Sequence, residues 1–219
     1  MSKDCTVSIS SFIAQRGIRE LLHFTTNRGA LGILASKALK SRERLGADPQ
    51  LEKIFFPNAE NRSRDAQWLD YVNLSVSQIN ERFFSISARN WHRDKDFWWA
   101  IISIHPDVMT HDGVYFTTTN NMYSGVRRQS GLIGLESMFA PRVTQWAGNV
   151  VTRSTNAPLN APTCNQAEVL YPAQLSTQYV RCIYTHSGRD ADELAGQMAA
   201  VGHEPIAIEV RPELFGEIT

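Results

Sequence analysis

The sequence predicts an α+β fold made of short strands and a few helices. Three observations lead to this prediction. Most apolar segments alternate with polar residues or form short continuous runs, as strands do, while helical spacing is confined to short stretches. The chain has 219 residues, 42% of them hydrophobic, and can bury a substantial core. It contains no internal repeat or low-complexity tract, so its length favours one domain over two.

The first elements expected are a helix over residues 10–17, a strand over residues 19–25 and a helix over residues 27–35. Ser10 and Ser11 can cap the first helix, and Gly17 can end it. Because side chains two apart share one face of a strand, His23 and Thr25 are predicted to lie together at the end of the strand. Taken alone, His23 fits a core histidine bonded to a backbone carbonyl better.

The segment from Lys40 to Asp70 is rich in charged residues and has few periodic apolar ones, so we expect a long loop. Its Phe55-Phe56-Pro57 stretch would be costly to leave in water. Part of the loop is therefore expected to fold over a site as a lid or binding loop. The alternative is a solvated surface excursion.

Further strands are expected over residues 70–77, 97–104 and 114–118, whereas residues 79–88 fit a helix or a strand. The first strand alternates most clearly, with Val72, Leu74 and Val76 on one face and small polar residues on the other. The second is the most apolar run in the chain and is too short to span a membrane. We therefore predict that it is a central strand.

The elements expected in the C-terminal half are a flexible basic stretch over 125–134, a short helix over 132–139, a long loop over 142–164, a strand over 166–171, a strand over 180–184, a helix over 190–201 and a strand over 205–210. The last helix is amphipathic and is followed by Gly202, a residue typical of helix ends. The long loop leads directly into the strand that contains Glu168. Loops of this kind often recognise substrates.

Glu168 is the residue that most needs an explanation, because it is ionisable and lies in an apolar strand. Ala167, Val169 and Tyr171 can face the core, while Gln166 and Glu168 share the other face. We expect that face to line a site. The alternative is a strand glutamate that points to water or pairs with an arginine.

Composition and missing motifs exclude several classes of protein. The 22 basic and 22 acidic residues cancel, so no overall field indicates nucleic acid as a partner, although a local basic groove is compatible with this balance. Cys5, Cys164 and Cys182 are odd in number and lack paired spacing, which argues against disulfides and zinc and for a reducing compartment. No signal or membrane-spanning pattern occurs, so we expect a soluble cytoplasmic protein. Nucleotide-loop, dinucleotide-binding, zinc-protease and serine-hydrolase motifs are absent, and no metal is expected.

An early His-x-Thr, a strand of small polar residues and a late strand glutamate remain, and this order resembles ADP-ribosyltransferases. More specifically, the chain resembles the DarT family of DNA ADP-ribosylating toxins over roughly residues 22–184. The segments that carry this resemblance are Leu22-His23-Phe24-Thr25, residues 72–77, residues 98–104 with Pro106, Phe116 with Asn120-Asn121, and residues 166–170. The resemblance implies a single ADP-ribosyltransferase-like domain over residues 1–219, with two packed, mostly antiparallel sheets and flanking helices.

The resemblance also implies roles for individual residues around NAD, the expected co-substrate. Glu168 would act at the glycosidic bond that breaks, with Arg64 as its catalytic partner. The residues expected to bind NAD are His23, Thr25, Asn27, Arg62 and Ser75, where Arg62 is also the alternative to Arg64. A carboxylate near the sugar suits this reaction because it stabilises an oxocarbenium-like transition state.

The acceptor implied by the resemblance is a base in single-stranded DNA, with guanine favoured over thymine. Residues expected to contact DNA are Arg142, Trp146, Arg153, Arg89 and Trp91, because basic side chains with interleaved aromatics suit phosphate contact and base stacking. A cognate antitoxin is the other expected partner. Three alternatives stay open: an ADP-ribosyltransferase acting on RNA or protein, an NAD-dependent phosphotransferase, and a non-catalytic NAD-binding module.

Overall fold

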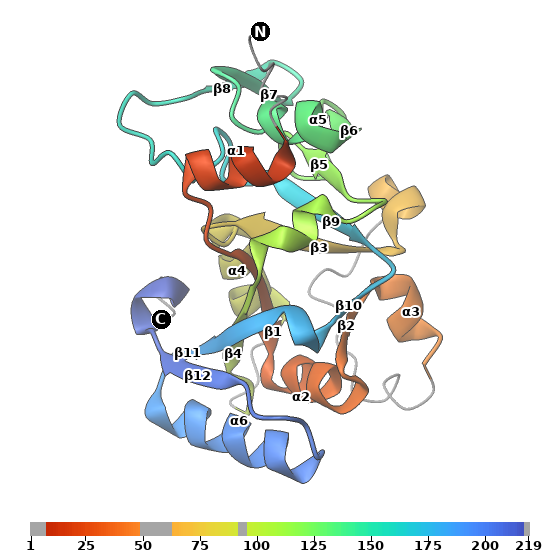
Figure 1. The fold of residues 1–219 in the computed structure, drawn as a ribbon, viewed down its shortest axis with the longest axis vertical. Coiled ribbons are helices and arrows are strands. Elements are labelled where there is room, and N and C mark those ends of the chain that lie inside the picture. The colour runs from red at the N-terminus through yellow and green to blue at the C-terminus, as the bar shows by residue number, and fades with distance from the viewer. Residues whose placement is uncertain (1–7, 49–62, 92–95, 217–219) are drawn as a thin grey trace, which may run out of the picture.

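The computed structural model describes residues 8–48, 63–91 and 96–216 (Figure 1). Eight of the strands in this part of the chain form one sheet in the order β12-β11-β4-β1-β3-β9-β5-β6. Their bounds are β1 Leu21–Thr26, β3 Tyr71–Val76, β4 Trp99–Ile104, β5 Tyr115–Thr117, β6 Arg128–Ser130, β9 Glu168–Pro172, β11 Val180–Thr185 and β12 Ala207–Val210. Every pair is antiparallel except β11 with β12, so the predicted α+β class with mostly antiparallel strands is confirmed.

The sheet consists of two four-stranded halves that meet at β1 and β3. These two strands share only two residue pairs, Leu21 with Val76 and Leu22 with Ser75, whereas β1 pairs with β4 along its whole length. Beyond Leu22, β1 and β3 therefore part. The two predicted sheets are present as these halves, joined at one narrow junction.

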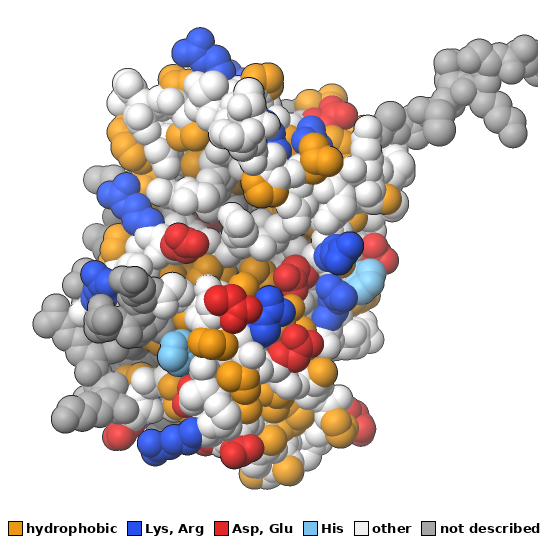
Figure 2. Space-filling view, turned by 90° about the vertical axis from the view of Figure 1, so that its left-hand side faces the viewer, with side chains coloured by type: hydrophobic (Ala, Val, Ile, Leu, Met, Phe, Trp, Pro, Cys, Tyr) orange, Lys and Arg blue, Asp and Glu red, His pale blue; other side chains and the backbone are white. Residues whose placement is uncertain are grey.

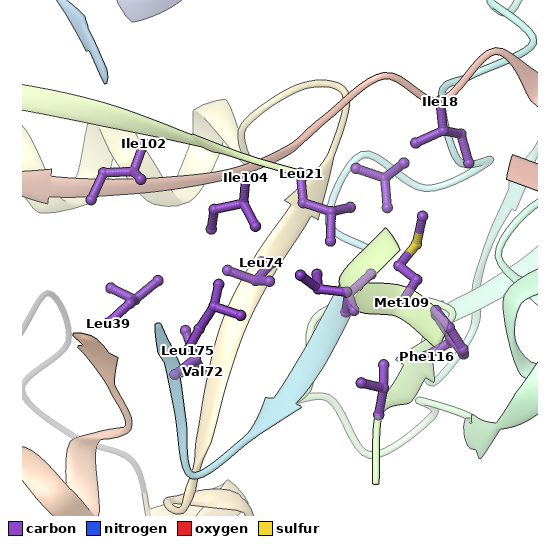
Figure 3. Packing of buried hydrophobic residues seen from close by; sticks show 14 of the residues in the cluster. Ile18, Leu21, Leu39, Val72, Leu74, Ile102, Ile104, Met109, Phe116 and Leu175 are labelled. Carbon is purple, nitrogen blue, oxygen red and sulfur yellow. The ribbon is translucent and has the colours of Figure 1, made fainter. Parts of the chain in front are cut away.

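The main hydrophobic core lies between the two halves and draws side chains from both (Figure 3). Leu21, Ile102 and Ile104 come from β1 and β4, and Val72 and Leu74 come from β3. All five are at most 3% exposed. Because a fully buried aliphatic side chain contributes about 1.5–3 kcal/mol, this shared cluster fixes the two halves against each other.

The helices in the described part are α1 Ile9–Arg16, α2 Asn27–Ser36, α3 Arg42–Gly46, α4 Glu81–Ile86, α5 Gly131–Ser137 and α6 Gly188–Ala200. α2 packs against α6 at one end of the molecule, and α1 packs against α5 near the other (Figure 1). No helix in the described residues is long and apolar enough to cross a membrane. The helices therefore flank the sheet, as expected.

Most predicted elements are confirmed within a few residues of their expected bounds. Val72, Leu74 and Val76 are buried on one face of β3, and every residue of β4 is buried, as expected for a central strand. α1 ends at Gly17, whose φ of 64° is the left-handed conformation that glycine tolerates best. Its N-cap is Ser8 and not the expected serine pair, because the Ser8 hydroxyl accepts the Ser11 N–H in a capping box.

The structure decides one open alternative, corrects one expectation and adds one pair of strands. The ambiguous segment 79–88 contains helix α4, which begins at the Asn80 cap. The expected loop over 142–164 begins with a hairpin of β7 Arg142–Trp146 and β8 Asn149–Thr152, which turns at Gly148. The short strands β2 Ala38–Lys40 and β10 Gln174–Ser176 pair with each other and were not predicted, because three residues are too few to show periodicity.

Shorter helical turns complete the described chain: η1 Ser63–Trp68, η2 Ser87–Trp91, η3 Pro106–Thr110, η4 Thr177–Tyr179 and η5 Pro212–Phe215. The expected loop over residues 40–70 contains α3 and η1. Its Phe55-Phe56-Pro57 stretch lies outside the described residues, so the proposed lid stays a prediction.

Candidate active site

Glu168 begins β9 and is only 8% exposed. Two neighbours fix its position. The Glu168 N–H donates to Thr117 Oγ1 at 2.9 Å, and the Asn121 N–H donates to Glu168 Oε2 at 2.8 Å. The second bond holds the carboxylate itself, because a backbone donor cannot rotate away as a side chain can. The carboxyl group is therefore buried and oriented, as a catalytic group must be.

Ser75 lies directly opposite Glu168 in the antiparallel register of β3 and β9. On its other side Ser75 pairs with Leu22 of β1. Opposed side chains of an antiparallel pair lie on the same face, so Ser75 and Glu168 are neighbours there. The structure thus brings these two predicted site residues together at the junction between the halves.

His23 lies where β1 and β3 part, one residue beyond their last pair. Its Nδ1 is 3.0 Å from the Asn73 carbonyl oxygen of β3. A carbonyl can only accept, so Nδ1 carries the proton and donates, which leaves Nε2 as an acceptor in the neutral ring. Burial lowers the pKa of His23, against a smaller opposing effect of the bond to Asn73, and so favours that neutral ring.

His23 and Glu168 therefore approach the same short stretch of β3 from opposite sides. His23 bonds to Asn73, and Glu168 opposes Ser75, two residues further along the strand. Two residues of a strand span about 7 Å. The two residues therefore flank the junction, His23 from β1 and Glu168 from β9.

Thr25 and Thr26 end β1 and lead into the N-terminus of α2. The Thr26 hydroxyl accepts the Gly29 N–H at 3.2 Å and caps the helix. Thr25 is 7% exposed and lies so close to Gly29 that a Cβ there would come within 2.0 Å of Thr25 Oγ1. Close packing of the helix start against β1 thus fixes the residues that follow His23.

Asn27 is buried, and both ends of its side-chain amide bond to the backbone. Its Nδ2 donates to the Asp96 carbonyl at 3.0 Å, and its Oδ1 accepts the Arg28 N–H at 3.0 Å. Its own N–H donates to the Trp98 carbonyl. These bonds tie α2 to the start of β4. Asn27 was expected to bind NAD, and the bonds favour a positioning role instead, because a ligand would have to displace one of them.

Arg142 and Trp146 lie on the exposed face of the β7–β8 hairpin, where the side chains alternate between exposed and buried. The Trp146 ring, 37% exposed, stands edge to face against Tyr123 with the centroids 5.3 Å apart. Gly125 also lies against this strand, since a Cβ placed on Gly125 would be 3.6 Å from Trp146 Cα. Tyr123 is two residues from Asn121, which bonds to Glu168. The hairpin and the candidate catalytic carboxylate are therefore close to each other.

Arg153 was expected to contact DNA, but its guanidinium turns back onto its own loop. Nη1 donates to the Ala161 carbonyl and Nη2 to the Pro158 carbonyl, both at 2.7 Å. The same group lies 5.6 Å from the Phe139 ring centroid. Partial burial, with a smaller contribution from Arg16, lowers its pKa. These contacts give Arg153 a structural role in shaping the segment before β9, and any DNA contact would compete with them.

The remaining predicted residues are only partly described. Arg62 lies outside the described residues, and the structure gives no side-chain position for Arg64 or Trp91. The arginine expected beside Glu168 therefore stays a prediction. Arg89 lies on the exposed side of η2, which follows α4. Its DNA contact also stays a prediction.

Sequence reasoning did not assign a role to Asn121, Tyr123 or Arg128, which all lie near Glu168. Asn121 stood in the Asn120-Asn121 pair that contributed to the resemblance, but nothing in the sequence indicates that its backbone N–H meets Glu168. Among the described residues no cluster of three or more His, Cys, Asp and Glu side chains could hold a metal ion.

A split antiparallel sheet with a buried histidine at the split and an oriented glutamate two strands away fits an ADP-ribosyltransferase. The family model that matches residues 22–216 is DarT, described as an ssDNA thymidine ADP-ribosyltransferase. Because the match covers most of the chain, the protein belongs to the DarT family. No curated protein sequence matches it.

Solved structures show the same fold at low sequence identity. DarT of Thermus sp. 2.9 in complex with carba-NAD⁺ is 13% identical, with a TM-score of 0.63 over 90% of this chain and 97% of that chain. The same Thermus protein with ADP-ribosylated ssDNA is 14% identical, with a TM-score of 0.62 over 91% and 97%. Thermosipho africanus DarTG with ADP-ribose is 16% identical, with a TM-score of 0.58 over 90% of this chain but 51% of that one.

Proposed function

We propose that this chain is an NAD-dependent mono-ADP-ribosyltransferase that modifies a base in single-stranded DNA, with Glu168 as the catalytic carboxylate and residues 1–219 as one domain. The observation that carries the proposal is the fixed Glu168 carboxylate. It accepts the Asn121 N–H at 2.8 Å and opposes Ser75 beside the junction that holds His23. Membership of the DarT family supports the reaction class.

The proposed reaction exchanges one glycosidic bond for another. The bond from the ribose C1′ of NAD to the nicotinamide nitrogen breaks, and nicotinamide leaves with the bonding electrons. The acceptor base forms the new bond to C1′ and releases its proton to water. Glu168 would stabilise the oxocarbenium-like sugar and bond to a ribose hydroxyl. The bond from His23 Nδ1 to Asn73 leaves Nε2 as an acceptor, which would accept a hydrogen bond from a second ribose hydroxyl.

NAD as co-substrate is supported by the solved relatives. A Thermus DarT structure contains carba-NAD⁺, another contains NAD⁺, and the Thermosipho DarTG structure contains ADP-ribose. Identity to these chains is low, so the transfer to this chain rests on the shared family. Thr25, Ser75 and an arginine, Arg64 or Arg62, complete the proposed NAD site, and Asn27 is proposed to position it.

Thymine is the acceptor base that we propose. The family description specifies thymidine, whereas the guanine preference expected from the resemblance has no support in the comparisons. A Thermus DarT structure with ADP-ribosylated ssDNA supports single-stranded DNA as the substrate class. A separate test of each base decides between the two.

The exposed face of the β7–β8 hairpin is the proposed DNA surface. Trp146 offers a ring supported by Tyr123, and Arg142 offers a cation on the same face. Stacking of one base on an aromatic ring is worth about 1–3 kcal/mol. The face of the molecule visible in Figure 2 has basic and acidic side chains interspersed, so that face does not carry a continuous basic track.

Two further features are proposals, the first from the resemblance and the second from the composition of the chain. One is a toxin role with a cognate antitoxin that blocks or reverses the modification. The other is a cytoplasmic location, which the free, buried Cys164 and Cys182 would suit.

The experiment that tests the proposed function incubates the purified chain with NAD and four matched single-stranded oligonucleotides, each lacking one base. Mass spectrometry then detects the added ADP-ribose. We expect modification of every oligonucleotide except the one without thymine. Loss of the signal only without guanine would establish the guanine preference instead, and modification of RNA or protein in parallel reactions, with no DNA product, would contradict the proposed acceptor.

A further inference from the structure

The carboxylate of Glu168 is held by a backbone donor that is itself held by an arginine. The donor is the N–H of Asn121, a residue 1% exposed. Arg128 bonds to Asn121 at two atoms: its Nε donates to the Asn121 side-chain oxygen, and its Nη2 donates to the Asn121 carbonyl. One guanidinium therefore fixes both the side chain and the backbone of the residue that orients Glu168.

Arg128 is well placed for this role because it begins β6, the edge strand beside β5. It pairs with Thr117 of β5, and the Thr117 hydroxyl accepts the Glu168 N–H at 2.9 Å. The turn between β5 and β6 contains Asn121. The strand pair thus brings Arg128 back over its own turn, where it meets the residue bonded to Glu168.

Arg128 also contacts the segment that precedes β3. Its guanidinium carbon lies 5.4 Å from the ring centroid of Trp68, the last residue of η1. Trp68 in turn packs against Tyr71 and Tyr115 with centroid distances of 5.0 and 5.1 Å. A cation over an aromatic ring contributes about 0.5–1 kcal/mol or more, so Trp68 holds the guanidinium plane in place.

We propose that Arg128 is a positioning residue of the transferase reaction, which acts on Glu168 through Asn121. Arginine is required because its planar group presents two parallel donors to one residue while its face lies on an aromatic ring. A lysine would keep the charge but offers a single, mobile donor group. This inference rests on the proposed function, because it assumes that Glu168 acts on NAD.

The inference predicts a specific kinetic defect. Without Arg128 the turn that contains Asn121 relaxes, and the Glu168 carboxylate loses its fixed orientation, but the surfaces that bind NAD are unchanged. We expect Arg128→Ala and Arg128→Lys to lower kcat for nicotinamide release by about 10- to 100-fold, the size of effect that a displacement of about 1 Å can have. The KM for NAD should stay within about threefold of the wild-type value.

The matched control is Arg127→Ala, one residue away. The Arg127 backbone bonds to Thr118 in both directions, and the substitution leaves those bonds intact. We expect wild-type kcat for it. Asn121→Ala removes one of the two contacts to Arg128 and keeps the backbone N–H, so its kcat should fall less than that of Arg128→Ala. In the double variant, which combines Arg128→Ala with Asn121→Ala, the two decreases in kcat should not add.

The test measures kcat, KM and melting temperature for these variants with NAD and the thymine-containing oligonucleotide. An Arg128→Ala variant with wild-type kcat, an Arg128→Lys variant with full activity, or a rise in KM that accounts for the whole defect overturns the inference and leaves the proposed function standing. If Arg128→Ala does not fold, Arg128→Lys and Asn121→Ala decide by the same criteria. A wild-type chain that releases no nicotinamide overturns both proposals.

Discussion

Thr25 Oγ1 occupies the space where the side chain of residue 29 would begin, because a Cβ on Gly29 would lie 2.0 Å from it. Gly29 is therefore required by a contact and not by a positive φ, since it lies inside α2. The contact joins the end of β1 to the start of α2. It sets the position of Thr25 two residues after His23, and so links helix packing to the proposed NAD site.

Gly29→Ala should destabilise the fold and weaken NAD binding, because Thr25 must move to make room. Overpacking of this kind costs about 1–3 kcal/mol. Differential scanning calorimetry and titration with NAD measure the two effects. Gly196→Ala in α6 is the control, since a Cβ there meets nothing within 4 Å and should stabilise the helix slightly. A stable Gly29→Ala variant with normal NAD affinity would show that Thr25 has no fixed role.

Glu168→Gln and Glu168→Ala should both abolish transfer, but only the alanine variant should lose stability. The glutamine oxygen can still accept the buried Asn121 N–H, whereas alanine leaves that donor without a partner at a cost of about 1–3 kcal/mol. Denaturant unfolding of both variants, together with the oligonucleotide assay, separates the two effects. Measurable transfer by Glu168→Gln would contradict a catalytic carboxylate.

His23 should make the stability of the protein depend on pH in one direction. Burial lowers its folded pKa below the usual 6.5, so the unfolded state takes up a proton first as the pH falls. The stabilising contribution is present above pH 6.5 and is lost as the pH falls below it. Melting temperatures of the wild type between about pH 7.5 and 5.5 should therefore drop more than those of His23→Gln. Equal drops in the two proteins would show that His23 titrates normally.

His23→Gln should also weaken NAD binding, because the variant lacks the Nε2 atom that we propose as the acceptor of a ribose hydroxyl. Isothermal titration with NAD at neutral pH measures this. Unchanged affinity combined with a large loss of thermal stability would instead identify His23 as a purely structural core histidine.

Arg142→Glu should reduce transfer to single-stranded DNA and leave slow NAD hydrolysis unchanged, because the exposed face of β7 would contact only the acceptor. The slope of the logarithm of the rate against the logarithm of the salt concentration should be shallower by roughly one unit in the variant than in the wild type. Arg189→Glu, which makes the same charge change on α6, is the control. Parallel loss of hydrolysis and transfer in Arg142→Glu would mean that the hairpin builds the NAD site itself.

Arg153 and Arg142 have different surroundings in the structure, although the sequence made them equivalent candidates for DNA contact. Its two donors bond to the carbonyls of Pro158 and Ala161 within one loop, so its charge is committed locally. Neither partner is a charged residue, and backbone carbonyls carry no sequence signal. The sequence could therefore identify both arginines as basic but could not assign them different roles.

The sequence by itself determined the order of the main strands and helices, because each long element has its own periodic pattern. Val72, Leu74 and Val76 are buried as their alternation predicts, and Leu194 and Met198 face inward as their helical spacing predicts. Glu168 could also be singled out, since an ionisable residue in an apolar strand is unusual wherever the strand lies. These features depend on residues that are close together in the sequence.

The tertiary structure alone decided how the candidate site is assembled. That β1 and β3 part after Leu22, that His23 bonds to Asn73, and that Asn121 orients Glu168 are contacts between residues some 50 positions apart. They depend on strand register and on backbone donors, which every residue but proline possesses and which therefore leave no mark in the sequence. Side-chain type identified the glutamate and the histidine, and long-range backbone pairing brought them to the same stretch of β3.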